Sequence, residues 1–273
     1  MPRLAFGAGE EDVLLGPAPP DVLDSGSLRY LGAFRLPPDG EREENAFAWG
    51  GEALAFDPQG DGGRGSLFLA GHNWHTRVAE VSLAAPSLSR DADSLPQARL
   101  LQPFADIRGG LFDRWDLEIP RVGLEVLDGA LFFCWGAHFE EPVPWGTHGA
   151  RSRDLSAPPP EAVCRVGGEG LVYAANDYLF TVPSAWRERL GGADLAAGRF
   201  RDGGWGGMGP SLFAIRSTDI RDAAMDETVE AVTLIRYDDS YGGDEGAKLD
   251  GYSHADWWSG GAWVDTAAGS AVV

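Results

Sequence analysis

Two histidines in one predicted loop form the first candidate for chemistry. His72 and His75 are separated by two residues, a spacing at which a tight loop could present both imidazoles to one metal ion. His138 and Glu140 would complete the ligand set if their segment lies beside this loop. The cofactor would then be a divalent cation, calcium or zinc. The simpler interpretation is a hydrogen-bonded loop without an ion, because two ligands alone do not define a metal site.

Four carboxylates form the second candidate. Asp113, Asp116 and Glu118 cluster before a predicted strand, and Glu52 follows the glycine pair that opens an earlier strand. Two carboxyl groups at a suitable separation could act as acid and as base or nucleophile on a glycoside. If Glu52 lies near the centre of the fold, burial would raise its pKa. Because the chain has 42 acidic residues, a chance cluster on a solvated surface is the alternative.

Tryptophan is abundant, with 10 residues in the chain. Indole rings pack well against the C–H faces of sugars, but they also simply fill space between sheets, which is their commoner use. We predict a ligand-binding face lined by indoles and nearby polar side chains. Its members are Trp49, Asn73, Trp74, Trp115, His138, Arg201, Trp205, His254 and Trp257.

Several function classes are disfavoured by the sequence. A formal net charge of −20 repels phosphate backbones and anionic lipid surfaces, so we expect no nucleic-acid or membrane partner. Residues 57–63 contain spaced acids and glycines but lack the closing glutamate of a calcium-binding EF-hand loop. Residues 203–209 are glycine-rich but do not match a phosphate-binding loop. The two cysteines, Cys134 and Cys164, would form a disulfide only if they lie on neighbouring strands; a buried thiol is the expectation for Cys134.

The elements that must position these residues are short strands. Five segments share a pattern in which glycine and apolar residues lead to a polar turn and a second apolar run: 50–69, 123–133, 170–180, 209–236 and 260–273. Such repetition predicts an all-β fold, a β-propeller with five blades by this count. Residues 1–26 are expected to be an extended lead-in, and 27–273 a single propeller domain. A β-sandwich is the alternative, although it does not explain the glycine-led strands, which suit close packing around an axis.

Chain direction then predicts which residues share a face. In a blade of four antiparallel strands, the segment leading into the first strand and the loop between the second and third emerge at one end. All five histidines and most tryptophans would gather there, whereas Asp57, Asp61, Asp128, Asn176 and Asp177 would lie in ordinary turns at the other end. Such an uneven distribution is typical of a binding face.

Several passages together resemble a known group of proteins. They are Tyr30-Leu31-Gly32-Ala33-Phe34-Arg35-Leu36-Pro37, Trp49-Gly50-Gly51-Glu52, Ser66-Leu67-Phe68-Leu69-Ala70-Gly71-His72, Gly207-Met208-Gly209-Pro210 and Trp258-Ser259-Gly260-Gly261-Ala262-Trp263. In these the chain is similar to uncharacterised bacterial propeller-like proteins, which often carry export signals. The resemblance implies a propeller and an extracellular or periplasmic location, but no activity and no catalytic residue. Residues 1–7 lack the apolar stretch of a secretory signal, and the apolar run at 270–273 predicts either a truncated chain or a last strand that closes a sheet.

These observations lead to three hypotheses. The first is a binding module that holds a glycan or another small polar ligand on one acidic face lined by tryptophan and histidine. The second is a glycoside hydrolase or lyase that uses the paired carboxylates on that face. The third is a scaffold for protein partners; the sequence does not specify an oligomeric state.

Overall fold

The structure is a computed structural model that describes residues 26, 28–111, 121–136, 145–167, 175–200, 210–236, 258, 260–266 and 269–273. Within these residues the protein is mostly β, with several antiparallel sheets and only short helices, which confirms the all-β prediction. None of the helices in this part of the chain has the length and apolar character needed to cross a membrane.

The first sheet contains four antiparallel strands in chain order. They are β1 (Leu54–Asp57), β2 (Ser66–Ala70), β3 (Val78–Ser82) and β4 (Leu100–Ala105). Three short helical turns accompany them: a 3-10 helix at Glu43–Asn45, α1 (Gly60–Gly63) between β1 and β2, and a 3-10 helix at Ala92–Ser94. The Asp57 carboxylate accepts a hydrogen bond from the Gln59 backbone N–H, as turn aspartates commonly do, so residues 57–63 form the predicted hairpin connection.

The second sheet contains three antiparallel strands, also in chain order. They are β5 (Arg121–Leu127), β6 (Ala130–Gly136) and β7 (His148–Ser152). Asp128 and Gly129 connect β5 and β6 with φ angles of 47° and 77°, the positive values that a tight hairpin turn of this type requires. Cys164 continues the sheet beyond β7 through a bridge to His148, and β8 (Arg165–Val166) follows it. Because His148 lies on the strand between Cys134 and Cys164, the two thiols do not pair, and both are free and buried.

The third sheet has the order β13-β11-β10-β9. Its strands are β9 (Tyr178–Thr181), β10 (Leu195–Arg199), β11 (Ser211–Ile215) and β13 (Val232–Ile235). Between them lie α2 (Ser184–Arg187) with a 3-10 turn at Glu188–Leu190, α3 (Ser217–Asp222), and β12 (Thr228–Val229), which pairs in parallel with β8. The third and fourth predicted repeats thus belong to one sheet, so a count of five blades does not follow from these sheets. A separate hairpin, β14 (Trp263–Thr266) and β15 (Gly269–Val272), ends the described chain.

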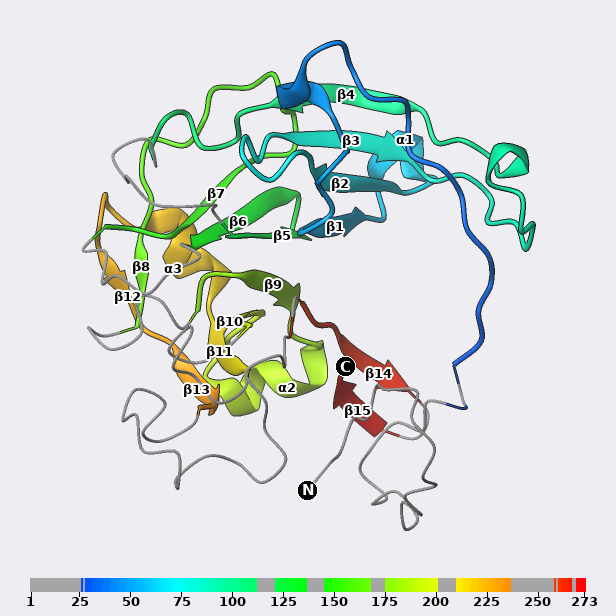
Figure 1. The fold of residues 1–273 in the computed structure, drawn as a ribbon. Coiled ribbons are helices and arrows are strands. Elements are labelled where there is room, and N and C mark those ends of the chain that lie inside the picture. Colours follow the sequence, from blue (N-terminus) through cyan, green and yellow to red (C-terminus); the bar gives the residue numbers. More distant parts are fainter. Residues whose placement is uncertain are drawn as a thin grey trace, which may run out of the picture.

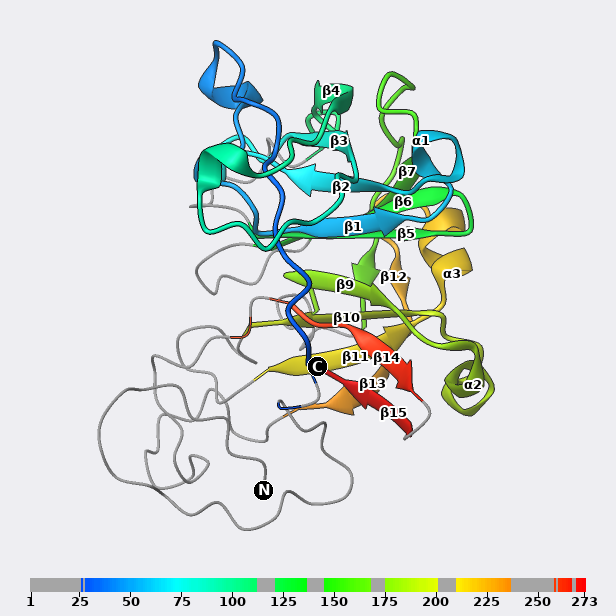
Figure 2. The ribbon, with the colours of Figure 1, turned by 90° about the vertical axis from the view of Figure 1, so that its right-hand side faces the viewer.

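The three sheets meet through their first strands. β1, β5 and β9 lie side by side through the middle of the molecule, and β4 and β13, the outer strands of the first and third sheets, lie on opposite sides of them (Figures 1 and 2). A Cβ atom on Gly123 of β5 would stand 2.7 Å from Cys134 Sγ and 2.7 Å from Tyr178 Cα of β9. Only glycine permits this approach, so the close packing expected at the glycine of this strand is present between β5 and β9. Apolar side chains of neighbouring sheets fill the space between them, including Phe68, Leu124 and Trp135.

The first sheet confirms the predicted direction of the chain. The Gly51 N–H donates to the Ala70 carbonyl and the Asn73 N–H donates to the Trp49 carbonyl, so the segment leading into β1 and the β2–β3 loop share one end. At the opposite end, Arg99 before β4 reaches Asp61 in the β1–β2 turn with a separation of 3.0 Å. We call the first of these ends the loop face.

Candidate functional site

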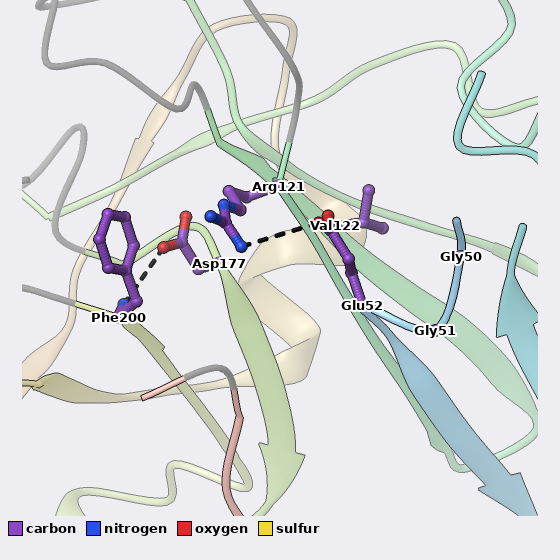
Figure 3. A pocket seen from close by; sticks show the side chains of 7 residues that line it. All are labelled: Gly50, Gly51, Glu52, Arg121, Val122, Asp177 and Phe200. Carbon is purple, nitrogen blue, oxygen red and sulfur yellow. Dashed lines mark hydrogen bonds and ion pairs between the residues drawn. The ribbon is translucent and has the colours of Figure 1, made fainter. Parts of the chain in front are cut away.

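A small cavity opens where the inner strands begin. It has a volume of about 190 Å³, and seven residues line it: Gly50, Gly51, Glu52, Arg121, Val122, Asp177 and Phe200 (Figure 3). These residues lie just before β1, at the start of β5, just before β9 and just after β10. We call this the inner cavity; each of the three sheets contributes to it at the end that corresponds to the loop face of the first sheet.

Glu52 is the acidic group at one side of the inner cavity. Its Oε1 lies 3.7 Å from Arg121 Nη1, and its Oε2 is buried without a hydrogen-bond partner among the described residues. Burial raises the pKa of Glu52 above 4.5; the nearby Arg121 opposes this rise and the negative charge of Asp177 adds to it. The position and the raised pKa agree with the sequence prediction for Glu52, whereas a catalytic role stays a prediction.

Asp177 is the second carboxylate at the inner cavity, and its place corrects the sequence analysis. We had assigned it to a hairpin turn at the other end of the fold. In the structure β9 pairs with β10, so the residues before Tyr178 lead into an inner strand and bring Asp177 to the cavity. Its Oδ2 accepts a hydrogen bond from the Phe200 N–H at 3.1 Å and lies 3.8 Å from Nε of the buried Arg199.

Two guanidinium groups lie beside the aromatic ring of the inner cavity. The Arg121 guanidinium carbon lies 5.2 Å from the centre of the Phe200 ring, and that of Arg199 lies 5.4 Å from it. Cations at this distance are attracted to the ring face and hold it in place. Carboxylate oxygens accept hydrogen bonds and guanidinium groups donate them, so the cavity offers both functions to one ligand.

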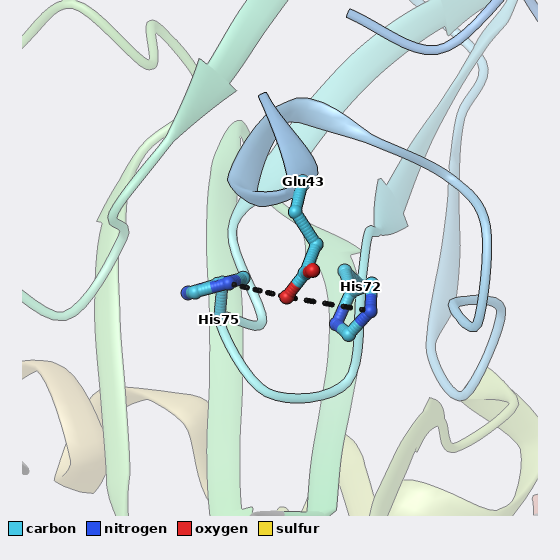
Figure 4. A group of neighbouring side chains, drawn as sticks. All are labelled: Glu43, His72 and His75. Carbon is cyan, nitrogen blue, oxygen red and sulfur yellow. Dashed lines mark hydrogen bonds and ion pairs between the residues drawn. The ribbon is translucent and has the colours of Figure 1, made fainter. Parts of the chain in front are cut away.

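A second group of side chains lies on the loop face of the first sheet. Glu43, His72 and His75 each direct one possible ligand atom inward, and these atoms lie within 4.8 Å of one another (Figure 4). Glu43 Oε1 is 3.1 Å from His75 Nε2 and 3.7 Å from His72 Nε2. We call these three residues the Glu–His–His cluster. Its carboxylate is Glu43; His138 and Glu140, the further ligands expected from the sequence, lie outside the described residues.

The predicted aromatic residues of the first sheet lie on the loop face. Trp49 is 80% exposed and Trp74 is 67% exposed, so their indoles are accessible to a ligand and contribute little to the core. The backbone hydrogen bond between Asn73 and Trp49 brings these residues together. The remaining predicted residues lie outside the described residues: Asp113, Trp115, Asp116, Glu118, His138, Arg201, Trp205, His254 and Trp257.

Four residues of the two sites were missed from the sequence: Glu43, Arg121, Asp177 and Phe200. Arg121 follows a proline and opens an apolar run, a position from which a charged residue at the start of an inner strand could have been predicted. The position of Asp177 at the cavity could be predicted only with the correct pairing of β9 and β10. Glu43 and Phe200 carry no signal of their own, because many acids and aromatic residues occupy similar local sequences.

The fold and the site define an all-β protein with a charged cavity at the meeting point of its sheets. Comparison with family models, with curated proteins and with solved structures found no match to this chain.

Proposed function

We propose that this protein is a binding module that holds one sugar residue, or another small neutral polyhydroxyl group, in the inner cavity. The observation that carries the proposal is the buried Oε2 of Glu52, which borders the cavity and has no hydrogen-bond partner among the described residues. An unsatisfied buried polar atom is costly, and a ligand hydroxyl that donates to it would remove that cost.

The size of the cavity limits the ligand. A volume of about 190 Å³ corresponds to roughly six water molecules at ~30 Å³ each. Cavities that enclose drug-sized molecules are larger, about 300–1,000 Å³. The cavity therefore suits a single ring or a short polar group. The rest of a longer glycan would lie across the loop face, where Trp49 and Trp74 expose their indoles.

The charges favour a neutral ligand. Arg121 would attract an anion, but Glu52 and Asp177 border the same cavity and the whole chain has a net charge of −20. A hydroxyl group can donate to Glu52 and accept from Arg121 without adding a charge. Neutral sugars meet this requirement.

The arrangement of the sheets around one axis is part of the same proposal. We infer that the sheets are blades of a β-propeller, as in the propeller-like group that the sequence resembles, and that the hairpin β14–β15 supplies strands of a further blade. The central position of β1, β5 and β9 supports this arrangement, since the first strand of each blade lies nearest the axis of a propeller (Figure 1). The inner cavity would then lie near the axis.

The test is equilibrium binding of neutral monosaccharides to the full chain and to two variants. Glucose, galactose, mannose and N-acetylglucosamine are titrated by ligand-observed NMR, with glucuronate as the anionic comparison. Glu52→Gln should weaken binding of the preferred neutral sugar by at least about tenfold, because it removes the charge and replaces one of the two acceptor oxygens by an NH₂ donor. Glu161→Gln removes the same charge at an exposed position outside the cavity and should bind like the wild type.

The proposal fails if the wild type binds none of these sugars. It also fails if Glu52→Gln binds as tightly as the wild type while retaining its melting temperature. Preference for glucuronate would contradict the argument from charge.

A glycoside hydrolase is the second candidate, favoured by one observation. Glu52 and Asp177 border the same cavity, and burial raises the pKa of Glu52, as a general acid requires. Glu52 would donate the proton to the leaving oxygen, and Asp177 would act as base or nucleophile. Release of nitrophenol from p-nitrophenyl glycosides by the wild type, abolished in Glu52→Gln, separates this enzyme from a binding module that shows no turnover.

A further inference from the structure

The Glu–His–His cluster lies on the first sheet, and none of its residues lines the inner cavity. Two imidazoles and one carboxylate are the ligand set of many zinc sites that keep a fourth position for water or substrate. We propose that this cluster binds one divalent transition-metal cation, with zinc as the best fit. Nitrogen donors disfavour calcium and magnesium, which prefer all-oxygen ligand sets.

The distances between the ligand atoms fit a tetrahedral ion. With metal–ligand bonds of about 2.0–2.1 Å, ligand atoms in a tetrahedron lie about 3.3 Å apart. Glu43 Oε1 lies 3.1 Å from one histidine nitrogen and 3.7 Å from the other, on either side of that value. The two imidazole nitrogens lie within 4.8 Å of each other, so a tetrahedral ion would require them to move closer together by up to about 1.5 Å.

The backbone holds the cluster in place before any ion binds. His75 and Thr76 both donate backbone hydrogen bonds to the His72 carbonyl, at 3.0 Å and 2.7 Å, and so form a tight turn that fixes the two histidines. The His72 N–H donates to the Ala46 carbonyl, which ties the end of the 3-10 helix that carries Glu43 to the same turn. A preorganised ligand set loses less conformational entropy on binding.

One contact opposes the ion and limits its affinity. The backbone N–H of Trp74 donates to Nδ1 of His72 at 3.3 Å. A neutral His72 imidazole therefore carries its proton on Nε2, which faces Glu43. To bind a metal through Nε2, His72 must move this proton to Nδ1 and lose the Trp74 contact. Metal-bound histidines usually donate their second N–H to an acceptor, so the site is expected to bind zinc less tightly than one with such an acceptor.

The experiment is metal titration of the full chain after removal of bound ions with a chelator. Isothermal titration with Zn²⁺ measures stoichiometry, and visible absorption with Co²⁺ reports tetrahedral coordination with nitrogen ligands. The wild type should bind one Zn²⁺ per chain, and excess Ca²⁺ should not displace it. Glu43→Gln and His75→Gln should each weaken Zn²⁺ binding by at least about tenfold, because loss of a ligand should cost at least as much as loss of a group that only orients a ligand.

A matched control separates this site from nonspecific attraction to an acidic protein. Glu44→Gln removes the same charge from the neighbouring position of the 3-10 helix but no ligand atom, and it should bind Zn²⁺ like the wild type. The proposal is overturned if the wild type shows no stoichiometric Zn²⁺ site, if Ca²⁺ competes at equal concentration, or if Glu43→Gln and Glu44→Gln lose affinity equally. None of these outcomes depends on sugar binding, so the metal site and the proposed function can fail independently.

Discussion

The inner cavity and the Glu–His–His cluster are two polar sites that are assembled in different ways. The cluster belongs to the first sheet, where Glu43 and His75 are 32 residues apart and one tight turn holds both imidazoles. The cavity takes residues from the beginnings of β1, β5 and β9 and from the end of β10. A local pattern in the sequence could therefore indicate the two histidines of the cluster, although not Glu43, whereas the cavity exists only when three sheets pack correctly.

The largest expected effect comes from changing the packing that builds the cavity. Gly123→Ala should reduce the free energy of unfolding by about 3 kcal/mol, because the new Cβ would overlap Cys134 and the backbone of Tyr178. Chemical denaturation measures this loss. Sugar binding should also weaken, while Zn²⁺ binding of the folded protein should persist, because the cluster lies on another sheet.

Gly129→Ala is the control for this packing effect. Gly129 has a positive φ of 77°, unlike Gly123, and an added Cβ there would meet nothing within 4 Å. The expected cost is about 1 kcal/mol from backbone strain alone. If Gly123→Ala and Gly129→Ala lose equal amounts of unfolding free energy, the close approach of β5 and β9 does not stabilise the inner strands.

Acid should destabilise the protein through the buried His148. Burial lowers the pKa of His148 to about 3 from an ordinary 6.5. Between these values the unfolded chain binds a proton that the folded chain does not, so stability falls as the pH falls. The expected loss between pH 6.5 and pH 4.5 is about 2–3 kcal/mol. Thermal or urea unfolding across this range measures it.

The comparison variant for this effect is His148→Asn. The asparagine amide can keep the contact that Nδ1 makes with the Thr147 hydroxyl, but it has no proton to gain in this range. Its stability should depend less steeply on pH. An unchanged slope would show that other groups cause the acid sensitivity.

Alkaline pH should destabilise the packing between β5 and β9 more modestly. Glu125 accepts a hydrogen bond from the Thr181 hydroxyl at 2.7 Å, and burial raises its pKa to about 7. Its contribution to stability is complete below about pH 4.5 and is lost as the pH rises through 7. Glu125→Gln should therefore be more stable than the wild type at pH 8, by about 2 kcal/mol after allowance for partial solvent screening.

The same variant should show no such advantage at pH 5, where the wild-type carboxyl is protonated. Melting temperatures at the two pH values make the comparison. If Glu125→Gln raises the melting temperature equally at both pH values, the stabilisation does not come from removing the ionisation of Glu125.

The smallest effect on stability is expected at the exposed aromatic residues. Trp74→Ala should change the free energy of unfolding by less than about 0.5 kcal/mol, because the indole is 67% exposed. Binding of a disaccharide should weaken more than binding of a monosaccharide if the loop face carries the second ring. Equal weakening for both ligands would remove Trp74 from the proposed extended site.

The sequence was sufficient for the all-β class and for the arrangement of the first sheet. Alternating apolar residues and the Asp128-Gly129 turn identified hairpins that the structure contains. Glycine in inner strands was interpreted correctly, since Gly123 faces the backbone of β9. These features depend on short-range geometry, which the local sequence encodes directly.

The third sheet shows where such inference stops. Residues 170–180 were interpreted as one hairpin, but β9 pairs with β10 across α2. That error placed Asp177 at the wrong end of the fold, so the second carboxylate of the cavity was not predicted. Strand pairing over a helical insertion is decided by tertiary packing, which local residue patterns do not specify. The burial of Glu52 could be predicted because it lies directly before β1, whereas its catalytic role stays a prediction.

The most direct test of the central claim is the carboxyl ¹³C resonance of Glu52, followed against pH with and without saturating neutral sugar. The resonance is assigned by its absence from Glu52→Gln. A buried carboxyl at a ligand-filled cavity should titrate above its ordinary value of 4.5, and the sugar should move both its chemical shift and its pKa. A pKa at or below 4.5, together with a resonance that no sugar disturbs, would contradict the assignment of the inner cavity as the binding site.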